Sequence, residues 1–214
     1  MPLALPRLYV ILDAGLLRQS AVELTEQLIS AGVRLFQYRA KNAPARQTLE
    51  ISSQLARLAR KAGAIFFVND RSDLAYLAGA HGVHVGQDDL SPEQARQVVG
   101  QDHWVGVSTH NLQQFQQAVA GSSDYVAIGP IFGTTSKANP DPVVGIDLIR
   151  PLRPLTRKPV VAIGGISLQN AAQVIQAGAD SVAVISDILC APDPAAQAAR
   201  FVQRLNAVNP AANL

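Results

Sequence analysis

The chain has 214 residues, of which 48% are hydrophobic and 16% are charged, and its formal net charge is +2. This composition is typical of a folded globular chain and excludes a disordered one. The small net charge, without any run of Lys or Arg, gives no support for binding to nucleic acid or to an anionic membrane surface.

Short apolar runs alternate with amphipathic segments along the whole chain. The apolar runs predict strands at residues 7–12, 33–38, 64–68, 82–85, 104–107, 124–128, 159–163 and 181–185. Helices are predicted at residues 20–31, 45–62, 72–77, from 91 onward, and at 111–120, 146–152, 167–177 and 194–205. Ser72 is the predicted cap of the third helix and Gly79 its stop signal, and Ser91 followed by Pro92 is a favoured helix start.

Strands that are apolar on both faces and alternate with helices indicate a closed parallel sheet. We therefore predict a (β/α)8 TIM barrel, with eight parallel strands and outer helices. The alternative is a doubly wound open sheet, which usually carries a Gly-rich dinucleotide-binding turn after its first strand; residues 13–15 are not such a turn. No linker divides the chain, so we expect one domain over residues 1–214, with a flexible tail at 207–214.

Acidic residues follow the third and fourth predicted strands. Asp70 comes after the third strand and Asp89 after the fourth. The outgoing strand ends of a barrel face the ligand site, so these carboxylates could share a hard cation such as Mg²⁺. The alternative is that both residues cap the helices that follow them.

Polar side chains also leave the second predicted strand. Gln37, Arg39 and Lys41 alternate along an extended segment and should point to one side of it. An amide, a guanidinium and an ammonium at one place suit a diphosphate. The alternative is a basic strand end in solvent.

The fifth predicted strand ends in Ser108, whose hydroxyl is expected to face the barrel mouth. His110 follows two residues later. We interpret it as structural, because nothing in the sequence places a partner beside it.

The loops after the last three strands carry donors for an anion. Gly164 and Gly165 let the backbone approach a ligand closely, at the place where barrels commonly bind phosphate. The donor residues of these loops are Thr134, Thr135, Ser136, Lys137, Gly164, Gly165 and Ser186. A surface loop without a ligand is the alternative for residues 129–144. Two anion sites beside a metal site suggest group transfer between phosphorylated molecules, with pyrophosphate as the leaving group.

The set QYRAK, FVNDR, GVHVGQDDL, GVSTH, DYVAIGPIFGTTSK, VVAIGGI and SVAVIS closely resembles the thiamine phosphate synthase family, in order and over nearly the whole chain. The resemblance implies a (β/α)8 barrel and an Mg²⁺-dependent transferase of thiamine biosynthesis. Such an enzyme joins 4-amino-2-methyl-5-(diphosphomethyl)pyrimidine to 4-methyl-5-(2-phosphoethyl)thiazole, or to its carboxylated form. The products are thiamine phosphate and pyrophosphate.

The resemblance also implies a role for each matched residue. The pyrimidine diphosphate is bound by Gln37, Arg39, Lys41, Asn69, Ser108 and Lys137. The metal ligands are Asp70 and Asp89, and the thiazole phosphate is bound by Thr134, Thr135, Ser136, Gly165, Ile185 and Ser186. Catalysis rests on Arg39, Lys41, Ser108 and Lys137, while pyrophosphate leaves first and the thiazole nitrogen then attacks the methylene cation.

Two other functions remain open. Thiazole tautomerases resemble this chain in their barrel and in a Ser-x-His segment, here Ser108 to His110, but they have no need of the diphosphate and metal residues together. A non-catalytic phosphate-binding barrel would not need the aspartate pair. We therefore favour the synthase.

The single cysteine, Cys190, excludes an intrachain disulfide and fits a reducing compartment. The first 14 residues lack the pattern of a secretory signal, and no stretch approaches the roughly 18 apolar residues that span a bilayer. We expect a cytoplasmic protein whose partners are small-molecule substrates rather than nucleic acid or membrane. The sequence leaves open whether it forms a homo-oligomer.

Overall fold

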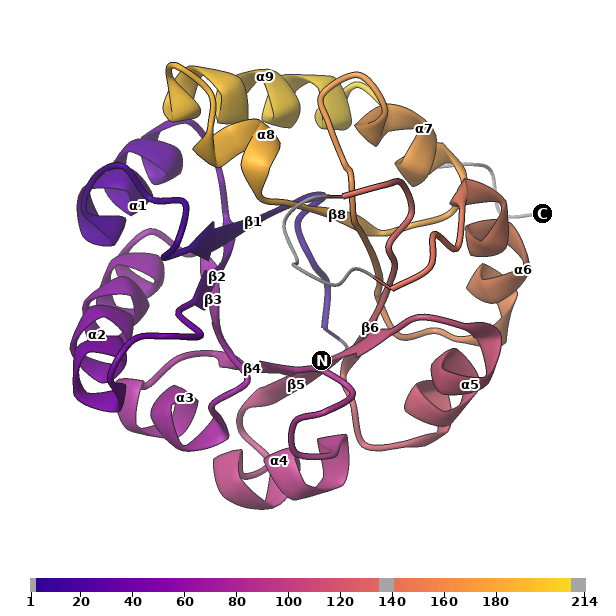
Figure 1. Ribbon diagram of the computed structural model, residues 1–214, viewed down its shortest axis with the longest axis horizontal. Helices are drawn as coiled ribbons and strands as arrows, with labels where there is room; N and C mark the ends of the chain where they lie inside the picture. The colour runs from indigo at the N-terminus through magenta and orange to yellow at the C-terminus, as the bar shows by residue number, and fades with distance from the viewer. Residues whose placement is uncertain (1–2, 135–140, 209–214) are drawn as a thin grey trace.

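The computed structural model describes residues 3–134 and 141–208. Its strands are parallel and form a closed barrel in chain order, with β8 paired to β1 (Figure 1). They are β1 (Leu8–Asp13), β2 (Leu35–Arg39), β3 (Ile65–Asn69), β4 (Gly82–Val85), β5 (Trp104–Thr109), β6 (Tyr125–Ile128), β7 (Val160–Ile163) and β8 (Ser181–Val184). The predicted (β/α)8 barrel is confirmed.

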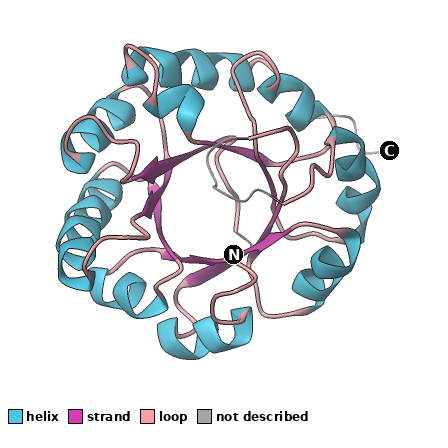
Figure 2. Cartoon of the chain, in the orientation of Figure 1, coloured by secondary structure: helices cyan, strands magenta, loops and turns pink. Residues whose placement is uncertain are grey.

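The helices surround the barrel on the outside (Figure 2). They are α1 (Ala21–Ser30), α2 (Ala45–Lys61), α3 (Ser72–Ala78), α4 (Pro92–Val99), α5 (Leu112–Ala120), α6 (Ile149–Leu152), α7 (Ala171–Gln176), α8 (Ser186–Leu189) and α9 (Pro194–Asn206). Short 3₁₀ helices, η1 (Ile146–Leu148) and η2 (Arg153–Leu155), flank α6.

The predicted helix signals are confirmed at two places. Ser91 caps α4 through a reciprocal pair of hydrogen bonds with Gln94, and Pro92 is the first helical residue. Gly79 ends α3 in the left-handed conformation, with φ of 65°. The predicted cap Ser72 is wrong, because Arg71 occupies the cap position and Ser72 already lies in the helix.

Three helices differ from the sequence prediction. The helix expected at 167–177 begins only at Ala171, because the Asn170 side chain accepts the N–H of Ser167 at 2.8 Å and holds a turn there. The segment expected as one helix at 146–152 begins as a 3₁₀ helix, and Pro151, which has no N–H to donate, lies in the short helix that follows. The helix α8 has 4 residues, too few to show a helical period in the sequence.

Side chains of the strands form two apolar layers. One layer packs between the barrel and the helices. The other fills the barrel, and we call it the interior cluster; its buried members are Tyr9, Ile11, Leu35, Phe67, Tyr125, Ala127, Val161 and Ala183. Gly106 makes room for the Tyr125 ring, because a Cβ at this position would lie 2.0 Å from its Cζ.

The residue just before β1 binds the C-terminal end of the described chain. Arg7 Nη1 donates to the carbonyls of Leu205 and Val208, each at 2.5 Å. Val208 is buried, and residues 209–214 of the expected tail lie outside the described residues. In residues 3–134 and 141–208, no helix is both long and apolar enough to cross a membrane.

Candidate active site at the barrel mouth

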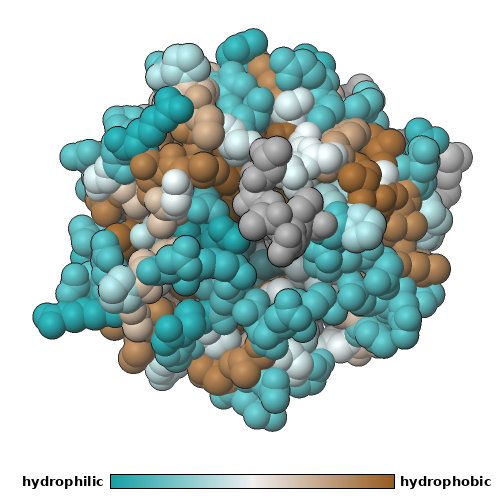
Figure 3. All heavy atoms as spheres, viewed as in Figure 1, coloured by the Kyte–Doolittle hydropathy of each residue, from teal (hydrophilic) through white to brown (hydrophobic). Residues whose placement is uncertain are grey.

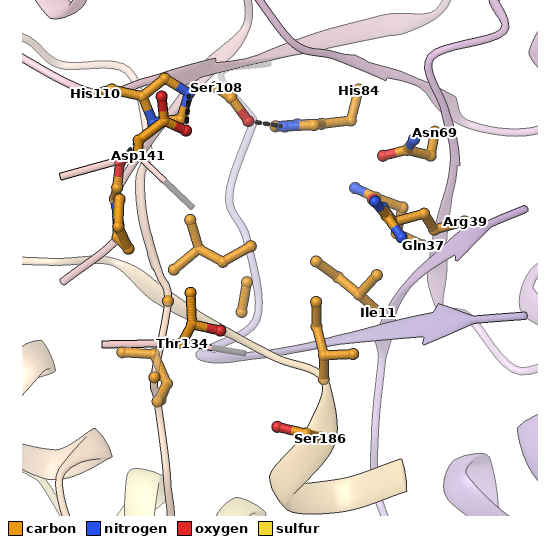
Figure 4. Close-up of a pocket in the computed structure, with 18 residues that line it drawn as sticks. Ile11, Gln37, Arg39, Asn69, His84, Ser108, His110, Thr134, Asp141 and Ser186 are labelled. Carbon is orange, nitrogen blue, oxygen red and sulfur yellow. Dashed lines mark hydrogen bonds and ion pairs between the residues drawn. The ribbon is translucent and has the colours of Figure 1, made fainter. Parts of the chain in front are cut away.

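A pocket lies among the carboxyl ends of the strands and the loops that follow them. The predicted site residues that line it are Gln37, Arg39, Asn69, Ser108, Thr134, Gly164, Gly165, Ile185 and Ser186. Figure 4 shows Gln37, Arg39 and Asn69 together on one wall, with Thr134 and Ser186 on other parts of the lining. Hydrophilic residues extend to the centre of the face that Figure 3 presents. The pocket therefore joins the residues predicted for both substrates.

The remaining predicted residues fall into two groups. Lys41, Asp70 and Asp89 do not line this pocket, although Asp70 directly follows the pocket residue Asn69. The other group, Thr135, Ser136 and Lys137, lies outside the described residues.

The guanidinium of Arg39 is held by an acidic residue that the sequence analysis did not single out. Arg39 Nη1 forms an ion pair with Oδ2 of Asp13, which is directly opposite Arg39 in the β1–β2 register. The other Asp13 oxygen accepts the N–H of Gly15 at 2.9 Å. Asp13 is buried, so this charge-assisted pair fixes the orientation of Arg39. The sequence signal for this contact was the acidic residue Asp13 at the end of the first predicted strand, next to the strand that carries Arg39.

Gln37 and Arg39 lie on the same side of β2, as the alternation predicts, whereas Lys41 lies beyond the end of the strand. Its ammonium is 3.4 Å from Asp70 Oδ2, and its side chain is half exposed. Lys41 therefore belongs with the carboxylate pair rather than with the pocket wall that Gln37 forms.

Asp70 adopts an uncommon backbone conformation, with φ of 61°, and its N–H donates to the carbonyl of His84 at 2.8 Å. Burial, with the adjacent carboxylate of Asp89, raises the pKa of Asp70 to about 6, although Lys41 opposes the shift. Asp89 Oδ2 accepts the N–H of Gly86 at 2.7 Å. Because the cap residues of α3 and α4 are Arg71 and Ser91, the alternative that these aspartates cap the helices is wrong.

The chemistry of this carboxylate pair fits a divalent cation. The carboxylate of Asp70 is partly buried beside that of Asp89, which is an arrangement that a bound cation stabilises. Among the described residues, no group of three or more His, Cys, Asp or Glu side chains could hold a metal. A cation at Asp70 and Asp89 would therefore take further oxygen ligands from water or from a phosphorylated ligand, as Mg²⁺ commonly does.

Ser108 contacts a histidine that the sequence analysis left without a role. Ser108 Oγ and His84 Nε2 are 2.8 Å apart, and both residues line the pocket (Figure 4). His84 Nδ1 lies 2.8 Å from the hydroxyl of Tyr125. The signal was the position of His84 between Val83 and Val85 in a short strand, where its side chain must face the barrel interior.

His110 also lines the pocket, and it has partners that the sequence did not reveal. Its Nδ1 lies 2.6 Å from the carbonyl oxygen of Gly129, and its Nε2 lies 3.5 Å from Asp141 Oδ2. The structure thus supplies partners for His110 that the sequence did not place, and its interpretation as a structural residue stays a prediction. Asp141 lies in the loop after β6, and sequence spacing gives no signal that it contacts His110, which follows β5.

The loop after β7 is shaped by two glycines. Gly164 and Gly165 have φ of 99° and 61°, a region that favours glycine. A Cβ on Gly165 would lie 2.5 Å from the carbonyl oxygen of Gly133, so a side chain here would push the loops after β6 and β7 apart. Asn170 Nδ2 donates to the carbonyl of Gly165 at 2.9 Å and secures the turn.

Sequence comparison identifies the family. A family model described as thiamine monophosphate synthase matches residues 8–188. The chain belongs to the thiamine monophosphate synthase family. The matched range contains every residue to which the resemblance gave a role, and the resemblance itself is confirmed.

Individual relatives of the thiamine monophosphate synthase family are similar over nearly their whole length. A thiamine-phosphate synthase of Koribacter versatilis is 54% identical over 209 residues, 95% of this chain and 98% of the relative. One of Chloroflexus aurantiacus is 45% identical over 203 residues, 94% and 93% of the two chains. The solved structure of thiamine phosphate pyrophosphorylase from Pyrococcus furiosus is 33% identical, with a TM-score of 0.86 over 94% of this chain and 96% of that one.

Proposed function

We propose that the protein is a thiamine-phosphate synthase. It joins 4-amino-2-methyl-5-(diphosphomethyl)pyrimidine to 4-methyl-5-(2-phosphoethyl)thiazole, or to its carboxylated form, and releases pyrophosphate. The observation that carries this proposal is that residues predicted for the pyrimidine and residues predicted for the thiazole phosphate line one and the same pocket. Two substrates that react with each other must meet in this way.

On the pyrimidine side, the residues of this chain bind the ring and stabilise departing charge. Gln37, Asn69 and Ser108 are polar groups of the pocket wall that can hold the ring. Arg39, already oriented by Asp13, donates to the diphosphate, and Lys41 adds a second positive charge from the side of Asp70. Fixed cations that face a leaving group lower the barrier to its departure.

Asp70 and Asp89 would hold Mg²⁺. When bound there, the cation supplies positive charge that offsets the charge on pyrophosphate. The support for this assignment is the position of Asp70, partly buried beside the Asp89 carboxylate; burial and Asp89 together raise its pKa, although Lys41 lies 3.4 Å away.

On the thiazole side, Gly165, Ile185 and Ser186 provide a close backbone approach, an apolar contact and a hydroxyl. Thr134 adds a further hydroxyl from the loop after β6. The resemblance adds Thr135 and Ser136 to the thiazole phosphate site and Lys137 to the pyrimidine diphosphate site. The proposal also places the enzyme in the cytoplasm, which its single cysteine supports.

The test is product formation from the two purified substrates with Mg²⁺, repeated with EDTA and with each substrate omitted. Thiamine phosphate and pyrophosphate in equal amounts, only when both substrates and metal are present, are the expected result. Folded protein that makes neither product would contradict the proposal.

One observation favours a second function, isomerisation of a thiazole phosphate. His110 lines the pocket beside Asp141, so a group able to move a proton is present. If coupling is the function, His110→Ala retains most coupling activity. Isomerisation of the carboxythiazole phosphate by the wild type, without coupling, would instead favour the tautomerase.

A further inference from the structure

A continuous chain of hydrogen bonds crosses the inside of the barrel from Gln37 to Ser108. Gln37 Nε2 donates to Tyr9 Oη at 2.8 Å, and Tyr9 Oη lies 3.1 Å from Tyr125 Oη. Tyr125 Oη lies 2.8 Å from His84 Nδ1, and His84 Nε2 lies 2.8 Å from Ser108 Oγ. Both ends of the chain line the pocket, and Figure 4 shows His84 and Ser108 on a different part of its lining from Gln37.

The middle of this chain is enclosed in apolar surroundings. Tyr9 and Tyr125 are 1% and 0% exposed, and both belong to the interior cluster. Phe67 packs against both rings, with its centroid 6.1 Å from that of Tyr9 and 5.2 Å from that of Tyr125. Two phenylalanines would fill this space equally well, and a buried hydroxyl costs free energy unless it is bonded. Packing therefore does not explain why both positions are tyrosine rather than phenylalanine.

Each group in this series of hydrogen bonds has few protons to donate, so the direction of one bond determines the direction of the next. Burial raises the pKa of both tyrosines, so each hydroxyl keeps one proton to donate. A neutral imidazole likewise has one donor nitrogen and one acceptor nitrogen. Gln37 donates to Tyr9, and the buried proton of Tyr9 needs an acceptor, which the Tyr125 hydroxyl provides. Tyr125 then donates to His84 Nδ1, and Nε2 of a neutral His84 donates to Ser108.

This direction decides what each end offers to the pocket. One N–H of Gln37 is engaged by Tyr9, and this bond fixes the amide in the orientation in which its oxygen serves as an acceptor. Ser108 accepts from His84, so its own proton is left as a donor. Reversal requires an amide flip at Gln37, the other tautomer of His84 and rotation of both tyrosine hydroxyls. The chain consequently reverses only as a whole.

We propose that Tyr9, Tyr125 and His84 are positioning residues that force Gln37 and Ser108 to present opposite hydrogen-bonding character to the pyrimidine ring. The inference rests on the proposed function. A 4-aminopyrimidine carries an amino donor and ring-nitrogen acceptors, which match an acceptor at Gln37 and a donor at Ser108. The 4-oxo analogue carries an acceptor where the amino group stood and a donor on the neighbouring ring nitrogen, so it requires the reversed chain.

The experiment compares the 4-amino substrate with its 4-oxo analogue in the wild type and in two variants that interrupt the chain. Tyr125→Phe breaks it at the centre, and Tyr9→Phe breaks it one bond nearer to Gln37. Each removes a single oxygen atom and keeps the ring, so either variant can serve if the other is poorly folded. Tyr38→Phe is the matched control, because Tyr38 is a buried tyrosine of β2 that packs between the barrel and the helices.

The wild type is expected to prefer the amino substrate by roughly 100-fold in kcat/KM, because a mismatched buried hydrogen-bonding pair is strongly rejected. In Tyr125→Phe and Tyr9→Phe, each end can reorient separately, so the preference falls by about tenfold, the effect of one hydrogen bond. The KM for the thiazole phosphate and the preference of Tyr38→Phe stay as in the wild type.

The outcomes separate this inference from the proposed function. A wild type that couples the amino substrate, with the same preference retained in Tyr125→Phe and Tyr9→Phe, overturns the inference alone. An equal loss of activity toward both substrates also overturns it, since a purely structural role would give that result. A wild type that makes no product overturns the proposed function and the inference with it.

Discussion

The two sides of the pocket are built by different means. On the side of β1 to β5, polar side chains project from strands and bind one another, as Gln37 does with Tyr9 and Arg39 with Asp13. On the side of β7, the described loop is shaped by the backbone conformations of Gly164 and Gly165. A strand fixes where a side chain points, whereas a glycine turn fixes where the backbone can go. Substitutions should therefore separate the two sides cleanly.

The largest effect is expected at the carboxylate pair. Asp89→Asn removes one of the two proposed metal ligands, so kcat should fall by ~100-fold or more, as loss of charge stabilisation does. The KM for the thiazole phosphate should change little, since its residues lie on the other side. Steady-state kinetics with each substrate varied in turn measure both effects, and equal changes for the two substrates would contradict separate sites.

Asp13→Asn tests whether Arg39 needs its partner. The substitution removes the negative charge that holds Arg39 in one orientation. The kcat/KM for the pyrimidine diphosphate should therefore fall roughly tenfold. Asp73→Asn is the control, because it breaks an exposed pair with Arg71, which should matter little. Tighter binding of the pyrimidine diphosphate in Asp13→Asn would show that Asp13 competes with the substrate instead of orienting Arg39.

Gly165→Ala tests the glycine side. The added Cβ meets the Gly133 carbonyl, and φ of 61° is strained for alanine, so the fold should lose ~1–2 kcal/mol and the KM for the thiazole phosphate should rise. Gly63→Ala is a matched control, because Gly63 has φ of 62° with nothing within 4 Å of the added atom. Urea unfolding and kinetics of both variants separate backbone strain from damage to the pocket. If the KM for the thiazole phosphate is the same in Gly165→Ala as in the wild type, Gly165 does not belong to the site.

The smallest effect is expected for Asp70→Asn, which should stabilise the folded protein when no metal is bound. Folding raises the pKa of Asp70 from 3.8 to about 6, so the folded protein binds this proton more tightly than the unfolded chain does. Ionised Asp70 therefore opposes folding above about pH 6, and the cost disappears as the pH falls toward 3.8. In EDTA at pH 8, Asp70→Asn should raise Tm by roughly 2–5 °C.

Thermal unfolding between pH 4 and pH 8 checks this sign. The difference between variant and wild type should shrink as the pH is lowered. Mg²⁺ should raise the Tm of the wild type more than that of Asp70→Asn, because a ligand stabilises the state that binds it. A variant less stable than the wild type at pH 8 would contradict the prediction.

The sequence predicted the barrel and much of the pocket because both depend on local patterns. Apolar runs marked each strand, and alternation within β2 correctly placed Gln37 and Arg39 on one side. Lys41 departed from this pattern because β2 ends at Arg39, and alternation holds only inside a strand.

The contacts that the sequence could not predict join residues far apart in the chain. Tyr9 and Tyr125 are separated by 116 positions, and their pairing follows from the barrel register and from the space left by Gly106. Asp13 meets Arg39 because β1 and β2 are neighbours in register, which no spacing within one segment reveals. His84 was overlooked because one polar residue in a buried strand has no local partner to mark its role.

The pairing of β1 with β8 bears on how the protein is made. β1 pairs with β8, and Arg7, just before β1, binds the carbonyls of Leu205 and Val208, so this part of the barrel closes only with residues far along the sequence. During synthesis on the ribosome, β1 keeps an unpaired edge until nearly all of these residues have emerged. An unpaired edge is a template for association with other chains. A protein truncated before β8 should therefore be insoluble, even when it contains most of the site residues.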